Sequence, residues 1–175
     1  LKDSFGLGDL YRYRAAIFGQ TGIKDSIFYY LNQAEKISAL QGSFKGVFVN
    51  KVTTVEAYLD YTDSVQKALT LALSICPDSS RMPQWAKYEL ELHLGRALLQ
   101  TGKATQGIPL IEKAAQGFIS MDMRSGKQKA NNILMDYYLS MNMNDAFVRC
   151  YKRSQTFTDS LNLAEKMRAV AAANI

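Results

Sequence analysis

The sequence predicts an all-α fold built from antiparallel helical hairpins. The clearest hairpin runs from Trp85 to Met121, where two apolar patterns with helical spacing of three and four residues flank a break at 101–103. The chain of 175 residues contains only 3 prolines, and apolar residues make up 47% of it. This composition favours helix and supports a single domain with a sizeable core. The same hairpin pattern recurs along the chain.

The first hairpin is predicted over about 9–42. Gly22 separates its two apolar stripes, and glycine readily takes the left-handed conformation that ends a helix. Asp25 or Ser26 then stands where a side chain caps the second helix by accepting a backbone N–H. The segment Gln41 to Ser43 closes this hairpin.

The second hairpin is predicted over about 44–80, and the third over about 84–122. The first helix of the second hairpin is rich in β-branched residues, so a strand is the competing local prediction. The pattern of the neighbouring units favours helix there. In the third hairpin, Pro109 lies near the start of the second helix, and proline is tolerated only in a first turn. We therefore expect that helix to start late or to lose a hydrogen bond.

The fourth hairpin is predicted over about 126–158, with Asn142 at its break. One more helix, the exit helix, is predicted over 159–175 and is still running at Ile175. The chain also begins without a methionine. We expect residues 1–175 to be a single repeat domain that forms part of a longer protein.

A repeat connects these hairpins. The small residues at the predicted hairpin crossings are Ala34, Ala72, Ala114 and Ser154. Their spacings are 38, 42 and 40 residues. The residues that stand twelve positions before these anchors are Gly22, Asp60, Gly102 and Asn142. All four types tolerate a helix stop, so the turn chemistry agrees with the apolar pattern.

The units resemble tetratricopeptide repeats. The third unit carries the resemblance best, through Leu94-Gly95, Leu98, Gly102, Gly107, Ile111 and Ala114. It departs from the family pattern because the period is longer, the leading aromatic position holds Glu91, and the closing proline is absent. The resemblance implies a degenerate form of the family. The implied fold is a right-handed α-solenoid of about four hairpins plus the exit helix.

A narrower resemblance involves the Asp-Ser pairs that start helices and the segment from Asp159 to Met167. These are similar to the repeat-bearing sensor regions of bacterial two-component histidine kinases and LuxR-type regulators, notably those of Bacteroidetes. In such proteins a repeat array precedes a long helix, a membrane span, and a kinase or DNA-binding module. The resemblance implies a sensory or scaffolding segment of a signalling protein. The alternatives are a cytoplasmic adaptor or transcription-regulator segment, and a self-association module.

The sequence predicts no catalytic, cofactor or metal site. The single histidine, His93, stands between Leu92 and Leu94 on an amphipathic helix and is expected to be partly exposed. Cys76 and Cys150 are expected to be free and mostly buried, because stacked hairpins place them on the order of 20 Å apart and a disulfide needs about 7 Å. We therefore expect this segment to be non-catalytic, with any kinase module elsewhere in the parent protein.

Stacked hairpins line a concave face with the first helix of each unit, which predicts a groove for a protein or peptide. The repeat pattern directs Arg12, Asn50, Arg96, Asn132 and Asp136 to the groove, and Tyr58 and Lys129 are candidates that lie nearby. They suit an extended peptide held through its backbone, or alternatively an acidic ligand. Tetratricopeptide-repeat proteins that grip a terminal carboxylate use a Lys/Asn/Arg set. Only Arg12 and Asn50 match that set, so carboxylate binding is not carried over.

The net charge of +5 is spread along the chain rather than concentrated in one stripe. The sequence therefore predicts no nucleic-acid binding by this segment. It lacks an apolar run of about 18 residues, so we expect no membrane contact by this segment either. Homodimerisation through the exit helix is an alternative to groove binding. The sensor resemblance favours a periplasmic location in a membrane-anchored protein, with the cytoplasm as the alternative.

Overall fold

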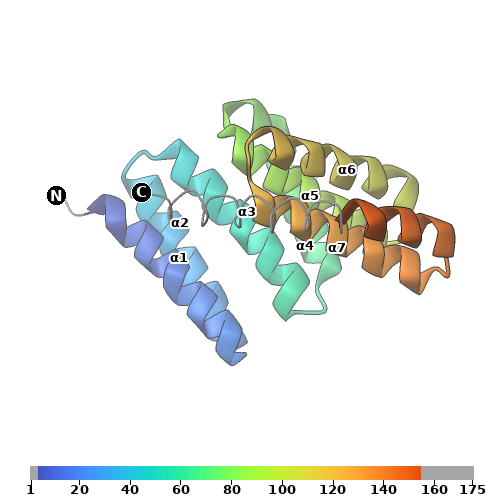
Figure 1. The fold of residues 1–175 in the computed structure, drawn as a ribbon. Coiled ribbons are helices and arrows are strands. Elements are labelled where there is room, and N and C mark those ends of the chain that lie inside the picture. The colour runs from blue at the N-terminus through green and yellow to red at the C-terminus, as the bar shows by residue number, and fades with distance from the viewer. Residues whose placement is uncertain (1–3, 155–175) are drawn as a thin grey trace, which may run out of the picture.

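The computed structural model describes residues 4–154, and this part of the chain is helical throughout, without strands (Figure 1). The helices are α1 (Ser4–Thr21), α2 (Lys24–Leu40), α3 (Phe44–Tyr61), α4 (Val65–Ile75), the 3-10 helix η1 (Cys76–Arg81), α5 (Gln84–Gln100), α6 (Ala104–Ser120) and α7 (Arg124–Ser140). A further helical stretch covers 144–154. The predicted all-α class is confirmed for these residues. The predicted exit helix over 159–175 lies outside the described residues.

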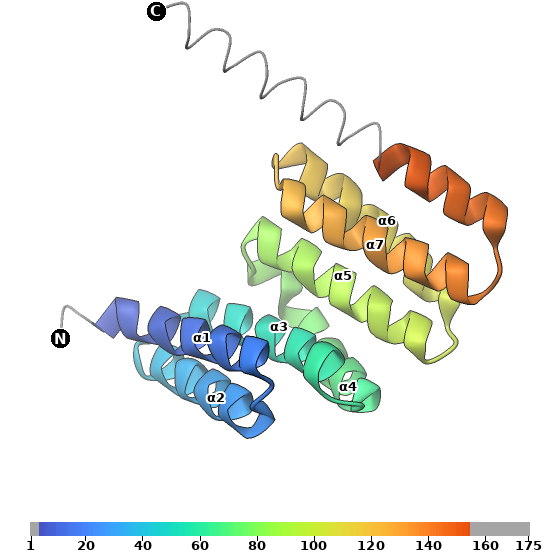
Figure 2. The same ribbon diagram turned by 60° about the horizontal axis from the view of Figure 1, so that its bottom comes forward.

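Each α-helix packs against the next one in the chain, from α1 on α2 through to α6 on α7. The odd-numbered helices also contact one another in series, α1 with α3, α3 with α5, and α5 with α7. Figure 2 shows the resulting tiers, in which the α1–α2 pair lies at one end of the described part and the stretch 144–154 lies at the other, next to α7. The odd-numbered helices therefore form a continuous row, and that row carries the site described below.

The core consists of three apolar groups between successive helices. One lies among α1, α2 and α3, the next among α3, α4 and α5, and the last among α5, α6, α7 and the stretch 144–154. The anchors at the predicted crossings are all buried, with exposed fractions of 0% for Ala34, Ala72 and Ala114 and 7% for Ser154. Small side chains at these points allow the paired helices to approach closely.

Several turns share one hydrogen-bonded geometry. The residues with positive φ are Gly22, Gly42, Gly102, Asp122 and Asn142. After each of them, the next N–H bonds the carbonyl five residues back, as Lys103 does to Leu98 at 2.8 Å. This is the Schellman arrangement, which satisfies the free carbonyls at the end of a helix. The predicted stops at Gly22, Gly102 and Asn142 are confirmed.

The predicted stop at Asp60 is wrong, because α3 continues through this residue to Tyr61. The chain turns at 62–64 instead, where Thr62 is extended with φ −140°. The Thr62 hydroxyl donates to the Tyr58 carbonyl at 2.8 Å and accepts from the Ser64 N–H at 3.1 Å. A threonine side chain thus ends α3 in place of a left-handed residue.

Three other local predictions have different outcomes. The β-branched segment of the second hairpin is the helix α3, as predicted. The second helix of the third hairpin does not start late, because α6 begins at Ala104 and contains Pro109. Proline has no N–H, so the Thr105 carbonyl has no helical donor at that position. The predicted caps at Asp25 or Ser26 are wrong, because α2 already begins at Lys24.

Candidate functional site

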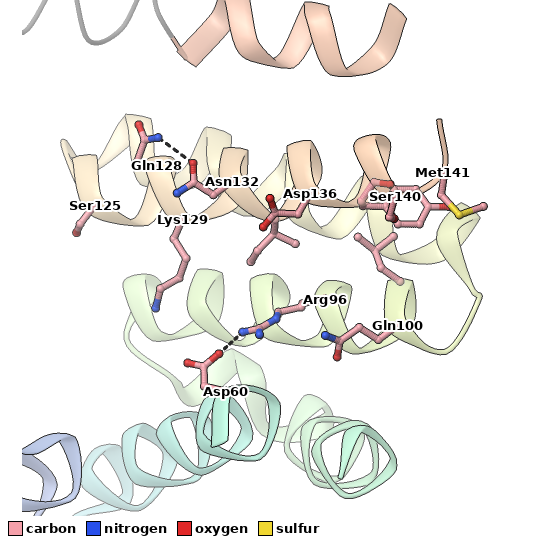
Figure 3. Close-up of a pocket in the computed structure, with 13 residues that line it drawn as sticks. Asp60, Arg96, Gln100, Ser125, Gln128, Lys129, Asn132, Asp136, Ser140 and Met141 are labelled. Carbon is pink, nitrogen blue, oxygen red and sulfur yellow. Dashed lines mark hydrogen bonds and ion pairs between the residues drawn. The ribbon is translucent and has the colours of Figure 1, made fainter. Parts of the chain in front are cut away.

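A cleft of about 820 Å³ lies between α5 and α7, with the end of α3 at one side (Figure 3). Side chains from the facing surfaces of α5 and α7, including Arg96, Gln100, Lys129 and Asp136, point into it. The lining residues are Asp60, Arg96, Leu99, Gln100, Ser125, Gln128, Lys129, Asn132, Ile133, Asp136, Tyr137, Ser140 and Met141. The cleft therefore lies on the row of odd-numbered helices.

Four of the predicted groove residues line this cleft together. They are Arg96 on α5 and Lys129, Asn132 and Asp136 on α7. Lys129, Asn132 and Asp136 stand three and four residues apart on α7, so they lie on one face of that helix. This part of the predicted groove is assembled in the structure.

The other three predicted groove residues do not line the cleft. Asn50 is 1% exposed, and its Nδ2 donates to Ser38 Oγ at 3.1 Å inside the α2–α3 contact. Tyr58 stacks on Phe28 with ring centroids 4.7 Å apart and borders a separate hollow over α4. Arg12 pairs with Asp9 at 2.7 Å near the N-terminal end. Asn50 and Tyr58 therefore do not share a pocket with the other four, whereas Arg12 lines a neighbouring pocket together with Lys129.

Both cations of the cleft are paired with carboxylates of α3. Arg96 bonds Asp60 and also donates to the Leu59 carbonyl at 3.3 Å. Lys129 reaches across from α7 and bonds Glu56. Asp136 is exposed and has no ion-pair or hydrogen-bond partner among the described residues. The uncompensated charge on the cleft wall is therefore negative.

A cluster of a buried histidine and two half-buried carboxylates lies beside the cleft, against the Lys129 side chain. His93 is 1% exposed, which contradicts the expectation that it is partly exposed. Its Nε2 lies 3.4 Å from Glu89 Oε2 and 3.8 Å from Glu56 Oε2, and neither ring nitrogen has a hydrogen bond. The cluster joins α3, α5 and α7, the three helices that frame the cleft.

The cluster shifts the pKa values of two of its members. Burial raises the pKa of Glu89, but the contacts with His93 and Lys129 outweigh burial and leave this pKa below the ordinary value of 4.5. Burial lowers the pKa of Lys129, but Glu56, Glu89 and Asp60 outweigh it and leave this pKa above 10.5. Both groups are thus stabilised in their charged forms.

Replacing Glu89 by Gln should make stability less sensitive to acid. A carboxyl with a depressed folded pKa stabilises the fold above its ordinary value of 4.5, and this contribution is lost as the pH falls through the folded pKa. We expect the variant to lose about 1 kcal/mol of unfolding free energy at neutral pH. This difference should shrink steadily below pH 4.5. Urea unfolding followed by circular dichroism across that range measures it.

Glu112→Gln is the matched control, because Glu112 on α6 makes no ion pair among the described residues. We expect its unfolding free energy at neutral pH to differ less from that of the wild type than the unfolding free energy of Glu89→Gln does. If Glu89→Gln behaves in the same way, the cluster does not stabilise the charged Glu89.

The cleft is polar at one end and apolar at the other. Gln128 Nε2 donates to Asn132 Oδ1 at 2.9 Å, which leaves the Asn132 Nδ2 group available as a donor. Gln128 also contacts Ser154 Oγ at 3.4 Å, so the stretch 144–154 helps to position these amides. The apolar end is formed by Leu99, Ile133, Tyr137 and Met141. Such a lining can hydrogen-bond a backbone and bury one side chain.

Sequence reasoning did not assign the remaining polar residues of the cleft to the site: Asp60, Gln100, Ser125, Gln128 and Ser140. Ser125, Gln128 and Lys129 stand at helical spacing before Asn132 and Asp136, which would have placed them on the same face. The partners in the His93 cluster were also missed. Glu89 stands four residues before His93, but the contribution of Glu56 comes from another helix.

Within residues 4–154, no group of three or more His, Cys, Asp or Glu side chains is arranged to hold a metal ion. None of the helices described there is long and apolar enough to span a membrane. Cys76 and Cys150 are both free, as predicted, although Cys76 is only half-buried. Comparison with protein-family models, curated proteins and solved structures gave no match. Function must therefore be inferred from the cleft itself.

Proposed function

We propose that this chain is a non-catalytic recognition module that binds an extended segment of a partner protein in the α5–α7 cleft. The observation that carries the proposal is the cleft of about 820 Å³, which has an amide-bearing polar end and an apolar end. A cleft of this size and mixed lining accommodates several residues of a peptide. Amides such as Asn132 can bond a peptide backbone, while the apolar end buries a side chain.

The fold that we propose for the whole segment is a right-handed α-solenoid of the tetratricopeptide type. Three features support it: the hairpin pattern of the sequence, the buried small anchors Ala34, Ala72 and Ala114, and the series of contacts among the odd-numbered helices. In such an array each unit contacts only its neighbours, and the row of first helices forms the binding face. The cleft lies on that row.

We further propose that the module is the sensory or scaffolding segment of a bacterial signalling protein. The support is the sequence similarity of the Asp-Ser helix starts and of the segment from Asp159 to Met167. Occupation of the cleft would alter the packing of α5 on α7, and a following helix would transmit that change. A cytoplasmic adaptor remains the competing proposal. A signalling readout of the parent protein with a blocked cleft separates the two.

Blocking the cleft tests the binding proposal. Gln100 lines the cleft from α5 and is exposed, so Gln100→Trp should fill the cleft without disturbing the core. Random peptides displayed on phage are selected on the wild type, and fluorescence anisotropy measures the affinity of the selected peptides. We expect Gln100→Trp to lower the affinity for these peptides by about tenfold or more, which corresponds to about 1.4 kcal/mol of binding free energy.

Gln116→Trp provides the matched control, because Gln116 is an exposed glutamine on α6 that does not line the cleft. Its affinity for the selected peptides should equal that of the wild type. If both tryptophan variants bind alike, or if selection enriches no peptide, the cleft is not a peptide site and the proposal fails.

A further inference from the structure

We infer that the cleft selects a peptide segment carrying a basic side chain close to an apolar one, rather than an acidic segment. This inference rests on the proposed function and concerns the same site. It starts from the charges on the cleft wall. Arg96 and Lys129 are the only cations among the described lining residues, and each already bonds a carboxylate of α3.

The positive charge of Lys129 is largely compensated by carboxylates of the chain itself. Its partner Glu56 on α3 lies outside the cleft lining, and Glu89 also attracts the ammonium group, so two carboxylates share one cation. Arg96 is held by Asp60 and by the Leu59 carbonyl. An acidic ligand would have to break these bonds or remain unpaired, and an unpaired carboxylate in a confined site is unfavourable.

Asp136 provides the complementary argument. It lies on the cleft wall of α7, is exposed, and has no cationic partner among residues 4–154 (Figure 3). A lysine or arginine side chain of a ligand can pair with Asp136 without breaking an ion pair among the described residues. Arginine and carboxylate form charge-assisted bonds that are stronger than neutral ones. The free carboxylate therefore favours a basic residue at this point.

The apolar side chain belongs at the adjoining end of the cleft. Leu99, Tyr137 and Met141 belong to that end, and Met141 is 56% exposed while Leu99 is 7% exposed. From Asp136 to Met141 the helix rises about 7.5 Å. An extended peptide covers that length in about two residues. The expected motif is thus a basic and an apolar residue separated by one position, in either chain direction.

A charge reversal tests the inference. Phage-displayed random peptides are selected separately on the wild type, Asp136→Lys and the control Asp145→Lys. Asp145 is an exposed aspartate outside the cleft, so its reversal produces the same change in net charge. We expect wild type and Asp145→Lys to enrich Arg or Lys two positions from an aliphatic or aromatic residue. Asp136→Lys should enrich Asp or Glu instead.

Affinities of individual peptides complete the test. Replacing the basic residue of a selected peptide by Glu should weaken wild-type binding by about tenfold or more and should strengthen binding to Asp136→Lys. If Gln100→Trp weakens binding of the selected peptides but these peptides are not enriched in Arg or Lys, this inference is overturned and the proposed function stands. If Gln100→Trp weakens binding of none of the selected peptides, both this inference and the proposed function are overturned.

Discussion

Gly107→Ala is expected to lower the melting temperature substantially, although it adds only one methyl group. An ideal Cβ at Gly107 would lie 2.6 Å from the Gly95 carbonyl oxygen, 3.1 Å from Leu99 Cδ2 and 3.2 Å from Leu98 Cβ. The nearest atom belongs to the backbone of α5, which cannot rotate away. Overpacking of this kind costs about 2–3 kcal/mol. For a chain of this size that corresponds to a fall of about 4–12 °C in the melting temperature.

The physical reason is the close approach of α5 and α6. A Cβ at Gly95 would likewise lie 2.6 Å from Ile111 Cγ1 and 2.8 Å from the Gly107 carbonyl oxygen, so the two glycines face each other across the crossing. To admit a methyl group, the helices must separate. Separation would also disturb the α5–α7 face, so we expect weaker peptide binding by the same variant.

Gly6→Ala is the matched control for this prediction. Gly6 is an exposed helical residue of α1, and a Cβ there has nothing within 4 Å. Alanine is the better helix former, so this variant should be as stable as the wild type or slightly more stable. Differential scanning calorimetry of both variants compares them. Equal melting temperatures for Gly107→Ala and the wild type would show that α5 and α6 do not pack this closely.

Phe118→Ala is expected to cause the largest loss of stability. Phe118 on α6 is 0% exposed and belongs to the apolar group shared by α5, α6, α7 and the stretch 144–154. Its ring packs edge-on against Tyr88 with centroids 6.0 Å apart, and a Cβ at Gly126 would lie 2.6 Å from its Cγ. Removing such a ring leaves a cavity and costs about 3–5 kcal/mol.

Guanidinium chloride unfolding followed by circular dichroism measures this loss. Ile119→Ala is the control on the same helix, because Ile119 is 54% exposed and its truncation should change stability by less than about 0.5 kcal/mol. If the two substitutions lower the free energy of unfolding equally, Phe118 is not a core residue and α6 does not pack on α7 in this way.

The sequence predicted helix positions and turns well because these depend on nearby residues. Apolar spacing identified both helices of each hairpin, and the residue types at Gly22, Gly102 and Asn142 predicted left-handed stops that the structure contains. The exception was Asp60, where a threonine two positions later ends the helix through its own hydroxyl. The Thr62 cap is also local, but it uses a side-chain hydroxyl instead of a left-handed residue.

The candidate site was predicted only in part because it depends on how far each helix is rotated. One residue along a helix turns the side chain by about 100°. The repeat pattern placed four residues of α5 and α7 correctly on the cleft wall. It placed Asn50 on the groove face, whereas α3 is rotated so that Asn50 points into the contact with α2.

The sequence by itself determined the all-α class, the alternation of helices with short turns and the small residues at the hairpin crossings. Each of these follows from propensities and periodicities within about one helical turn or hairpin. Only the tertiary structure decided which charges remain available to a ligand. Glu56 and Lys129 are 73 residues apart, and Asp60 and Arg96 are 36 apart. No local pattern could show that these pairs neutralise both cations and leave Asp136 without a partner among residues 4–154, because pairing over such separations depends on the packing of α3, α5 and α7.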